Sequence, residues 1–179
     1  MKWHMTRSEL EHAIRAACDV ADDTEVWVFG SQSIFGQFPD APEVLRQSAE
    51  ADIAPRNHPE RVDQIDGALG ELSQFHRTHG FYVHGVAIES ATLPPDWQLR
   101  TVPVPGRGAR ESTGYCVEGH DLAASKLVAF REKDREFVRV LLAEQMIDSV
   151  TLLERIASLP ISSTQRDRIA AWVRAVGSV

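Results

Sequence analysis

Two acidic residues, Glu50 and Asp52, are separated by one residue in the segment SAEADIA at residues 48–54. The alternating pattern predicts a strand, along which residues two apart point to the same side. Both carboxylates then project together, while Ala51 and Ile53 face the core. Paired carboxylates are typical ligands of a divalent cation such as Mg²⁺, which also binds substrate phosphates. An acidic pair of this kind also occurs on strand faces that are simply solvated, and the spacing alone leaves both interpretations open.

A second candidate for chemistry is the turn at Gly30 and Ser31, directly after the apolar run EVWVF at Glu25–Phe29. A glycine that ends a strand lets the backbone approach a ligand closely, because no β-carbon is in the way. Ser31 is predicted to begin a short helix, whose first N–H groups and dipole favour an anion. A Gly-Ser turn also serves as an ordinary helix cap, which remains the alternative.

Together, the two features resemble the polymerase-beta-like nucleotidyltransferases, in which Gly-Ser at a strand–helix junction precedes an acidic-x-acidic strand. The resemblance implies that Gly30 and Ser31 bind the phosphates of a nucleotide. It also implies that Glu50 and Asp52 are catalytic metal ligands in an in-line displacement. The implied cofactor is Mg²⁺, with Mn²⁺ as the alternative ion.

Most of that superfamily has a third carboxylate on a neighbouring strand. The expected third strand, Phe81–Ile88, presents His84 at this inward position, and a histidine either ligates a metal or acts as a base. Glu89, one residue beyond the strand, is the substitute carboxylate. Without a third carboxylate, a second hypothesis applies, in which the chain keeps the fold as a non-catalytic module that senses a nucleotide or binds a protein.

The C-terminal half carries a closer resemblance. The sequence HDLAASKL at residues 120–127, followed by REKDREF at 131–137, resembles uncharacterised bacterial nucleotidyltransferase-like proteins related to the AbiEii toxins. The similarity covers roughly residues 25–155. It implies an NTP as substrate and an RNA, a protein or a small molecule as acceptor. It also implies a toxin of a toxin–antitoxin or phage-defence pair, with a cognate antitoxin as partner.

Two lysines in this half are further candidates. Residues from about 121 to 144 have an amphipathic helical pattern with a break expected near Arg131, and Lys126 and Lys133 border its apolar stripe if the helix is continuous. A bordering lysine either reaches a triphosphate as a point charge or covers apolar surface with its stem. With the resemblance, both are candidate nucleotide-binding residues and Lys126 is a candidate catalytic one. Lys133 and Asp134 alternatively belong to a structural ion pair.

The expected fold class is α/β (α+β), a small mixed nucleotidyltransferase-type sheet flanked by helices, with a C-terminal helical portion. We expect residues 1–118 to form the core and residues 119–179 to form helices packed on it as one compact unit. A first helix is expected to begin at a capping box of Thr6 and Glu9 and to end near residues 22–23. The other expected strands cover residues 25–29, 99–104 and 115–117, and the other expected helices begin at residue 31 or cover residues 60–75, 149–158 and 164–176.

The composition restricts the classes of function. The chain has 179 residues, of which 43% are hydrophobic and 25% charged, and a net charge of −7. An acidic chain is poorly suited to broad DNA binding, which neutralises phosphates over a wide face. No apolar run approaches about 20 residues, so no membrane span is expected, and the cytoplasm is the expected location. Cys18 and Cys116 are expected to be reduced and buried.

Overall fold

The computed structural model describes residues 4–177, which divide into two compact units. The first unit comprises the residues up to Ser90 together with Thr101–Val117. The second comprises Ala91–Arg100 together with the residues from Glu118 onward.

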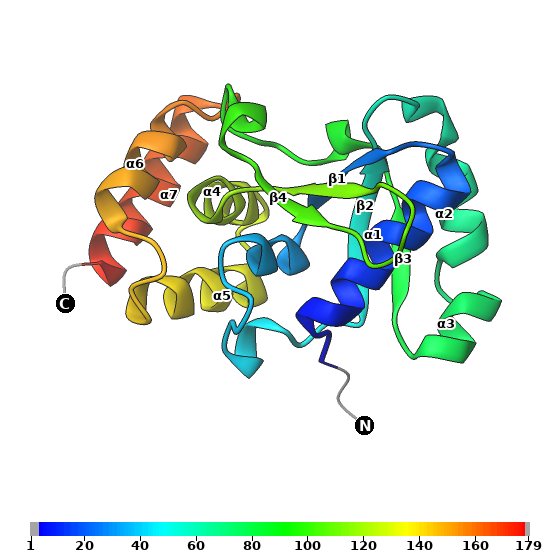
Figure 1. Cartoon of the computed structure of the whole chain (residues 1–179). Coiled ribbons are helices and arrows are strands. Elements are labelled where there is room, and N and C mark those ends of the chain that lie inside the picture. Colours follow the sequence, from blue (N-terminus) through cyan, green and yellow to red (C-terminus); the bar gives the residue numbers. More distant parts are fainter. Residues whose placement is uncertain (1–3, 178–179) are drawn as a thin grey trace. The chain divides into compact units, whose positions relative to one another are not determined.

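The first unit is built on a five-stranded sheet with the strand order β3-β2-β1-β5-β4 (Figure 1). The strands are β1 (Glu25–Phe29), β2 (Glu50–Pro55), β3 (Tyr82–Gly85), β4 (Val102–Pro105) and β5 (Thr113–Cys116). β1 is antiparallel to β2 and parallel to β5, β2 is parallel to β3, and β4 is antiparallel to β5. The sheet is therefore mixed, and the expected fold class is confirmed.

Helices bury one face of this sheet. α1 (Arg7–Ala21) begins at the expected capping box, in which Thr6 and Glu9 exchange hydrogen bonds. Its apolar stripe is fully buried against the strands: a β-carbon at Gly114 of β5 would overlap the side chain of Ile14. α2 (Val62–Leu69) packs beside β3, and Figure 1 shows both helices next to the sheet. Glu50 and Asp52 of β2 alternate with the buried Ala51 and Ile53 and therefore point to the other face.

Several elements of the first unit are shorter than the sequence pattern predicts. The expected helix over residues 60–75 is wrong as one piece. It consists of η3 (Pro59–Arg61), α2 and α3 (Gln74–His79). The chain leaves the helical path after Leu69, because Gly70 is the C-cap of α2 and Leu72 has a positive φ of 65°. The helix after Gly30 is the 3₁₀ helix η1 (Ser31–Gly36).

Two predicted strands also differ. The expected strand over residues 81–88 ends at Gly85, before the 3₁₀ turn η4 (Ile88–Ser90). The expected strand over residues 99–104 begins only at Val102, because η5 (Trp97–Arg100) precedes it. A further 3₁₀ turn, η2, covers Glu43–Leu45.

The second unit is helical. It contains α4 (Gly119–Ala129), α5 (Glu132–Ala143), α6 (Ser149–Ala157) and α7 (Ser163–Val176). The expected break is confirmed: Phe130 adopts a left-handed conformation with φ of 54° between α4 and α5. Lys126 and Lys133 therefore lie on separate helices and do not share one continuous edge.

A buried carboxylate holds three segments of the second unit together. Asp121 is fully buried and accepts hydrogen bonds from Arg100 at 2.7 and 3.1 Å. Nε of Arg155 on α6 lies 3.0 Å from Oδ1 of the same carboxylate. A buried charge of this kind is stable only with such partners. Over the residues described, none of the helices is both long and apolar enough to span a membrane.

Candidate functional site

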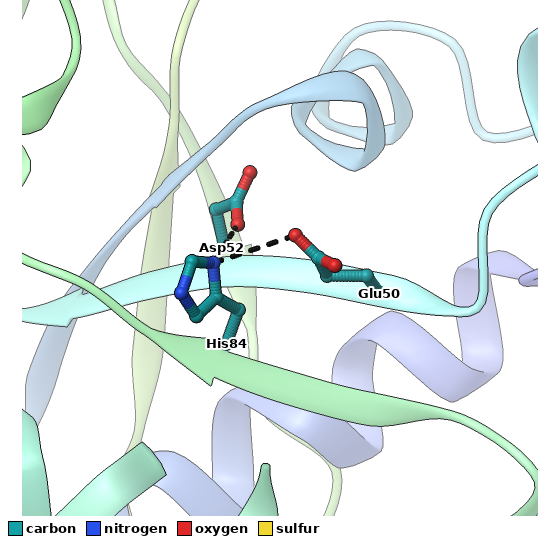
Figure 2. Close-up of side chains that lie close together, drawn as sticks. All are labelled: Glu50, Asp52 and His84. Carbon is teal, nitrogen blue, oxygen red and sulfur yellow. Dashed lines mark hydrogen bonds and ion pairs between the residues drawn. The ribbon is translucent and has the colours of Figure 1, made fainter. Parts of the chain in front are cut away.

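The parallel pairing of β2 with β3 brings the polar residues of the open sheet face together. In this register Glu50 pairs with Tyr82, and Asp52 pairs with His84. Paired residues on adjacent strands project to the same side of a sheet, and the strands lie about 4.8 Å apart. Figure 2 shows the side chains of Glu50, Asp52 and His84 pointing toward one another.

These three side chains form a compact cluster of potential ligands. Nδ1 of His84 lies 3.0 Å from Oδ1 of Asp52 and 3.4 Å from Oε1 of Glu50. One ligand atom from each residue lies within 4.8 Å of the other two. The side chains of His84, Glu50 and Asp52 are 45%, 36% and 25% exposed. The cluster is therefore open to an ion or a substrate from solvent.

Each carboxylate uses its second oxygen for a different contact. Tyr82 donates a hydrogen bond of 2.6 Å to Oε2 of Glu50, which orients that carboxylate. Oδ2 of Asp52 lies against Gly30, where a β-carbon would overlap this oxygen and lie 3.1 Å from Cγ of Asp52. Gly30 also has a φ of 66°, which other residues rarely adopt. One oxygen of each carboxylate thus remains directed toward His84.

The three groups strongly influence one another's protonation. Burial, together with the hydrogen bond and charge of Glu50, raises the pKa of Asp52 to about 7, although His84 opposes the shift. Burial alone would raise the pKa of Glu50, but the hydrogen bonds with Tyr82 and Asp52 and the charge of His84 lower it below its usual value. Burial would lower the pKa of His84, but the two carboxylates raise it. The two neighbouring carboxylates therefore differ in proton affinity, with the higher pKa at Asp52.

The Gly30–Ser31 turn is held beside the start of β2. The backbone N–H and the hydroxyl of Ser33 both donate to the carbonyl oxygen of Gly30, at 3.1 and 2.8 Å. Gln32 is buried and donates from Nε2 to the carbonyl oxygen of Ser48 at 2.9 Å. The turn and the acidic strand are thereby brought together, as the sequence-based hypothesis requires.

The sequence interpretation did not identify Tyr82 or Gln32 as site residues. Tyr82 is two residues before His84, so the same alternation that selected His84 also places Tyr82 on that face. Gln32 has no comparable signal, since its hydrogen bond to Ser48 spans 16 residues. Glu89, the substitute carboxylate, lies on η4 and is not part of the cluster.

Lys126 and Lys133 belong to the second unit, whereas the cluster belongs to the first. Nζ of Lys126 lies 3.7 Å from Oδ1 of Asp134 and 4.4 Å from the ring centroid of Phe137. Asp134 is buried and also bonds to Arg131 at 2.7 Å. The ion pairs of Asp134 are therefore with Lys126 and Arg131, while Lys133 is exposed on α5.

Comparison with known proteins identifies the family. No curated protein and no solved structure matches the chain. Residues 8–173 match the model of the family DUF6036, which is described as a nucleotidyltransferase of unknown function. The match extends from α1 into α7 and includes the strand pair that carries the acidic cluster. The chain therefore belongs to this family of nucleotidyltransferases.

Proposed function

We propose that this protein transfers a nucleotidyl group from a metal-bound NTP to an acceptor. The observation that carries the proposal is the convergence of Glu50, Asp52 and His84 next to a glycine turn that contacts Asp52. Family membership supports the reaction class. The contact between Gly30 and Asp52 supports a shared site for the cation and the phosphates.

Each residue of the cluster has a role in this proposal. Glu50, Asp52 and His84 hold a divalent cation, Mg²⁺ or Mn²⁺, and Tyr82 orients Glu50. The cation, when bound, neutralises charge on the phosphate oxygens during in-line displacement. Gly30 permits close approach of the phosphates, and Ser31 begins η1, where the first backbone N–H groups have no partner within the helix.

We assign Lys126 and Lys133 to the triphosphate on the sequence resemblance of the segments 120–127 and 131–137. Lysine acts there as a mobile point charge. For Lys126, the proposal requires that Nζ exchange its 3.7 Å contact with Asp134 for a phosphate oxygen. The two roles are separable, because Asp134 keeps Arg131 as a second partner.

The biological setting is also a proposal. Resemblance to proteins related to the AbiEii toxins supports a cytoplasmic toxin of a toxin–antitoxin pair, with RNA or protein as acceptor and a cognate antitoxin as partner. Direct DNA binding over a wide face is not part of the proposal, given the net charge of −7.

The decisive test is transfer of label from each of the four α-³²P-labelled NTPs to total RNA and to soluble protein. Wild type is expected to label one of the two pools in the presence of Mg²⁺ or Mn²⁺. Asp52→Asn is expected to abolish labelling, because it removes a charged ligand. Asp63→Asn, a matched change at an exposed carboxylate on α2, is expected to label as wild type does. Equal labelling by Asp52→Asn and wild type would refute the assignment.

A second function is favoured by one observation, the position of His84 between the two carboxylates. A protonated imidazole offsets one of their two negative charges without a metal ion, which suits a non-catalytic module that senses a nucleotide or binds a protein. Calorimetry with ATP and Mg²⁺, run beside the labelling assay, separates the two functions. Heat of binding without labelling of either pool supports nucleotide sensing, and labelling excludes it.

A further inference from the structure

We propose that the cluster selects a divalent transition-metal ion, Mn²⁺, in preference to Mg²⁺, with Nδ1 of His84 as a direct ligand. The inference rests on the proposed function for the existence of a cation site. It goes further by naming the ion and the ligand atom that selects it.

The distances from Nδ1 of His84 to the two carboxylates fit neighbouring positions around an octahedral ion. Adjacent ligands at 2.0–2.1 Å from such an ion are about 3 Å apart. Nδ1 of His84 lies 3.0 Å from Oδ1 of Asp52 and 3.4 Å from Oε1 of Glu50. Three protein ligands leave three of the six positions of such an ion for phosphate oxygens and water.

The contacts outside the cluster determine which carboxylate oxygens are available to a metal ion. Oε2 of Glu50 is bound by the hydroxyl of Tyr82, and Oδ2 of Asp52 lies against Gly30. Each carboxylate therefore contributes one oxygen rather than two. The ligand set is two oxygens and one imidazole nitrogen, with Nδ1 already directed toward both oxygens (Figure 2).

This mixed set discriminates between ions by ligand chemistry. Mg²⁺ takes oxygen ligands almost exclusively and keeps several of its waters. Imidazole suits first-row transition ions, which bind a nitrogen more strongly than Mg²⁺ does. Two carboxylates and the phosphates of an NTP are hard oxygen ligands, which suit Mg²⁺ and Mn²⁺ alike. The nitrogen ligand is therefore the part of the site that favours Mn²⁺ over Mg²⁺.

The test measures metal binding by the full chain without nucleotide. Mn²⁺ affinity is measured by electron paramagnetic resonance titration, and Mg²⁺ affinity by competition, for wild type and His84→Asp. The variant has three carboxylates and is the all-oxygen reference. Mutation of a group that only supports a metal ligand typically lowers metal affinity by about 10- to 100-fold. Replacement of a direct nitrogen ligand by oxygen should therefore lower the ratio of Mn²⁺ affinity to Mg²⁺ affinity by at least about tenfold. An unchanged ratio would overturn the inference.

A spectroscopic readout makes the test independent of variant stability. Electron spin-echo modulation of Mn²⁺ bound to wild type is expected to show coupling to a ¹⁴N nucleus. The coupling should persist in the matched variant His58→Asp, since His58 precedes η3 and aspartate is a favoured N-cap there. Bound Mn²⁺ without nitrogen coupling in wild type overturns the inference even if His84→Asp does not fold.

Failure of this inference is distinguishable from failure of the proposed function. Nitrogen-coupled Mn²⁺ in a protein that labels neither RNA nor protein leaves the metal assignment in place and refutes transfer. Labelling that depends on Asp52, in a protein whose bound Mn²⁺ has only oxygen ligands, supports transfer and refutes the role of His84.

Discussion

Gly30 lies so close to Asp52 that a β-carbon at residue 30 would overlap Oδ2 of that carboxylate. The contact joins the end of β1 to the middle of β2, and the strand register places Phe29, the residue before Gly30, opposite Asp52. The phosphate-binding turn and the acidic strand proposed here are thus in direct contact.

The first prediction concerns Gly30→Ala. The new methyl group would displace Asp52, and the backbone angles of Gly30, φ 66° and ψ −170°, add about 1–3 kcal/mol of strain for any other residue. We expect lower stability in urea unfolding and at least about tenfold weaker Mn²⁺ binding, because a ligand is moved.

Gly67→Ala on α2 is the control. Nothing lies within 4 Å of a β-carbon there, and alanine should stabilise the helix by about 0.5–1 kcal/mol. Unchanged Mn²⁺ affinity in Gly30→Ala would show that the contact does not position Asp52.

The second prediction concerns Tyr82→Phe, which removes the 2.6 Å hydrogen bond to Glu50. Without it, the pKa of Glu50 should rise and the carboxylate should lose its fixed orientation. Groups that orient a metal ligand contribute about 10- to 100-fold in affinity, so Mn²⁺ binding should weaken by that amount. Tyr115→Phe is the matched control, since its hydroxyl donates to Glu25 at 3.0 Å, outside the cluster. Equal Mn²⁺ affinities for the two variants would contradict a positioning role of Tyr82.

The third prediction separates the two roles of Lys126. Lys126→Met should raise the KM for NTP by about tenfold or more, because the protein loses a positive charge that contacts the triphosphate. Asp134→Asn removes the partner of Lys126 within the second unit and should lower stability with little change in KM. A KM unchanged in Lys126→Met would assign the lysine to the ion pair alone. Lys133→Met, measured in parallel, tests the second lysine.

The fourth prediction concerns the pH dependence of stability at His120. Burial would lower its pKa, but contacts with Glu118 at 2.7 Å and Asp148 at 3.1 Å raise it above the ordinary value of 6.5. A raised histidine pKa stabilises the fold fully below about pH 6.5, and this contribution is lost as the pH rises through the folded pKa. Burial would raise the pKa of Glu118, but hydrogen bonds from His120 lower this pKa below 4.5. The stability that the ionised Glu118 contributes is therefore lost only when the pH falls through its lowered folded pKa.

The measurement is the free energy of unfolding of wild type and His120→Gln at about pH 5.5 and about pH 8.5. The difference between the two proteins should be larger at the lower pH. His79→Gln, on α3, serves as the histidine control outside this contact. A difference that is the same at both pH values would show that His120 is not a charged partner of Glu118.

The sequence predicts those parts of the site that depend on alternation within one strand. Period-two spacing selected Glu50, Asp52 and His84, and the strands have the register that places all three on one face. It also predicted the burial of the opposite face and the capping box of α1. These features depend on residues close together in the chain.

The features that the sequence did not predict depend on long-range pairing or on single backbone angles. The hydrogen bond from Gln32 to Ser48 requires the antiparallel pairing of β1 and β2. Leu72 adopts a left-handed conformation that hydrophobic periodicity does not reveal, so the length of the helix expected over residues 60–75 was overestimated. The turn at Phe130 brings Lys126 and Asp134 together as an ion pair. In one continuous helix, residues eight apart would be too distant to form this pair.

The close packing of residues 30 and 52 also has an evolutionary consequence. Because a side chain at residue 30 and a carboxylate at residue 52 compete for the same volume, the two positions should vary together among descendants of this chain. Lineages that abandon the acid at residue 52 are free to replace the glycine, whereas lineages that keep it are not. Glycine at residue 30 would then mark, within a set of divergent sequences, those that retain a cation site.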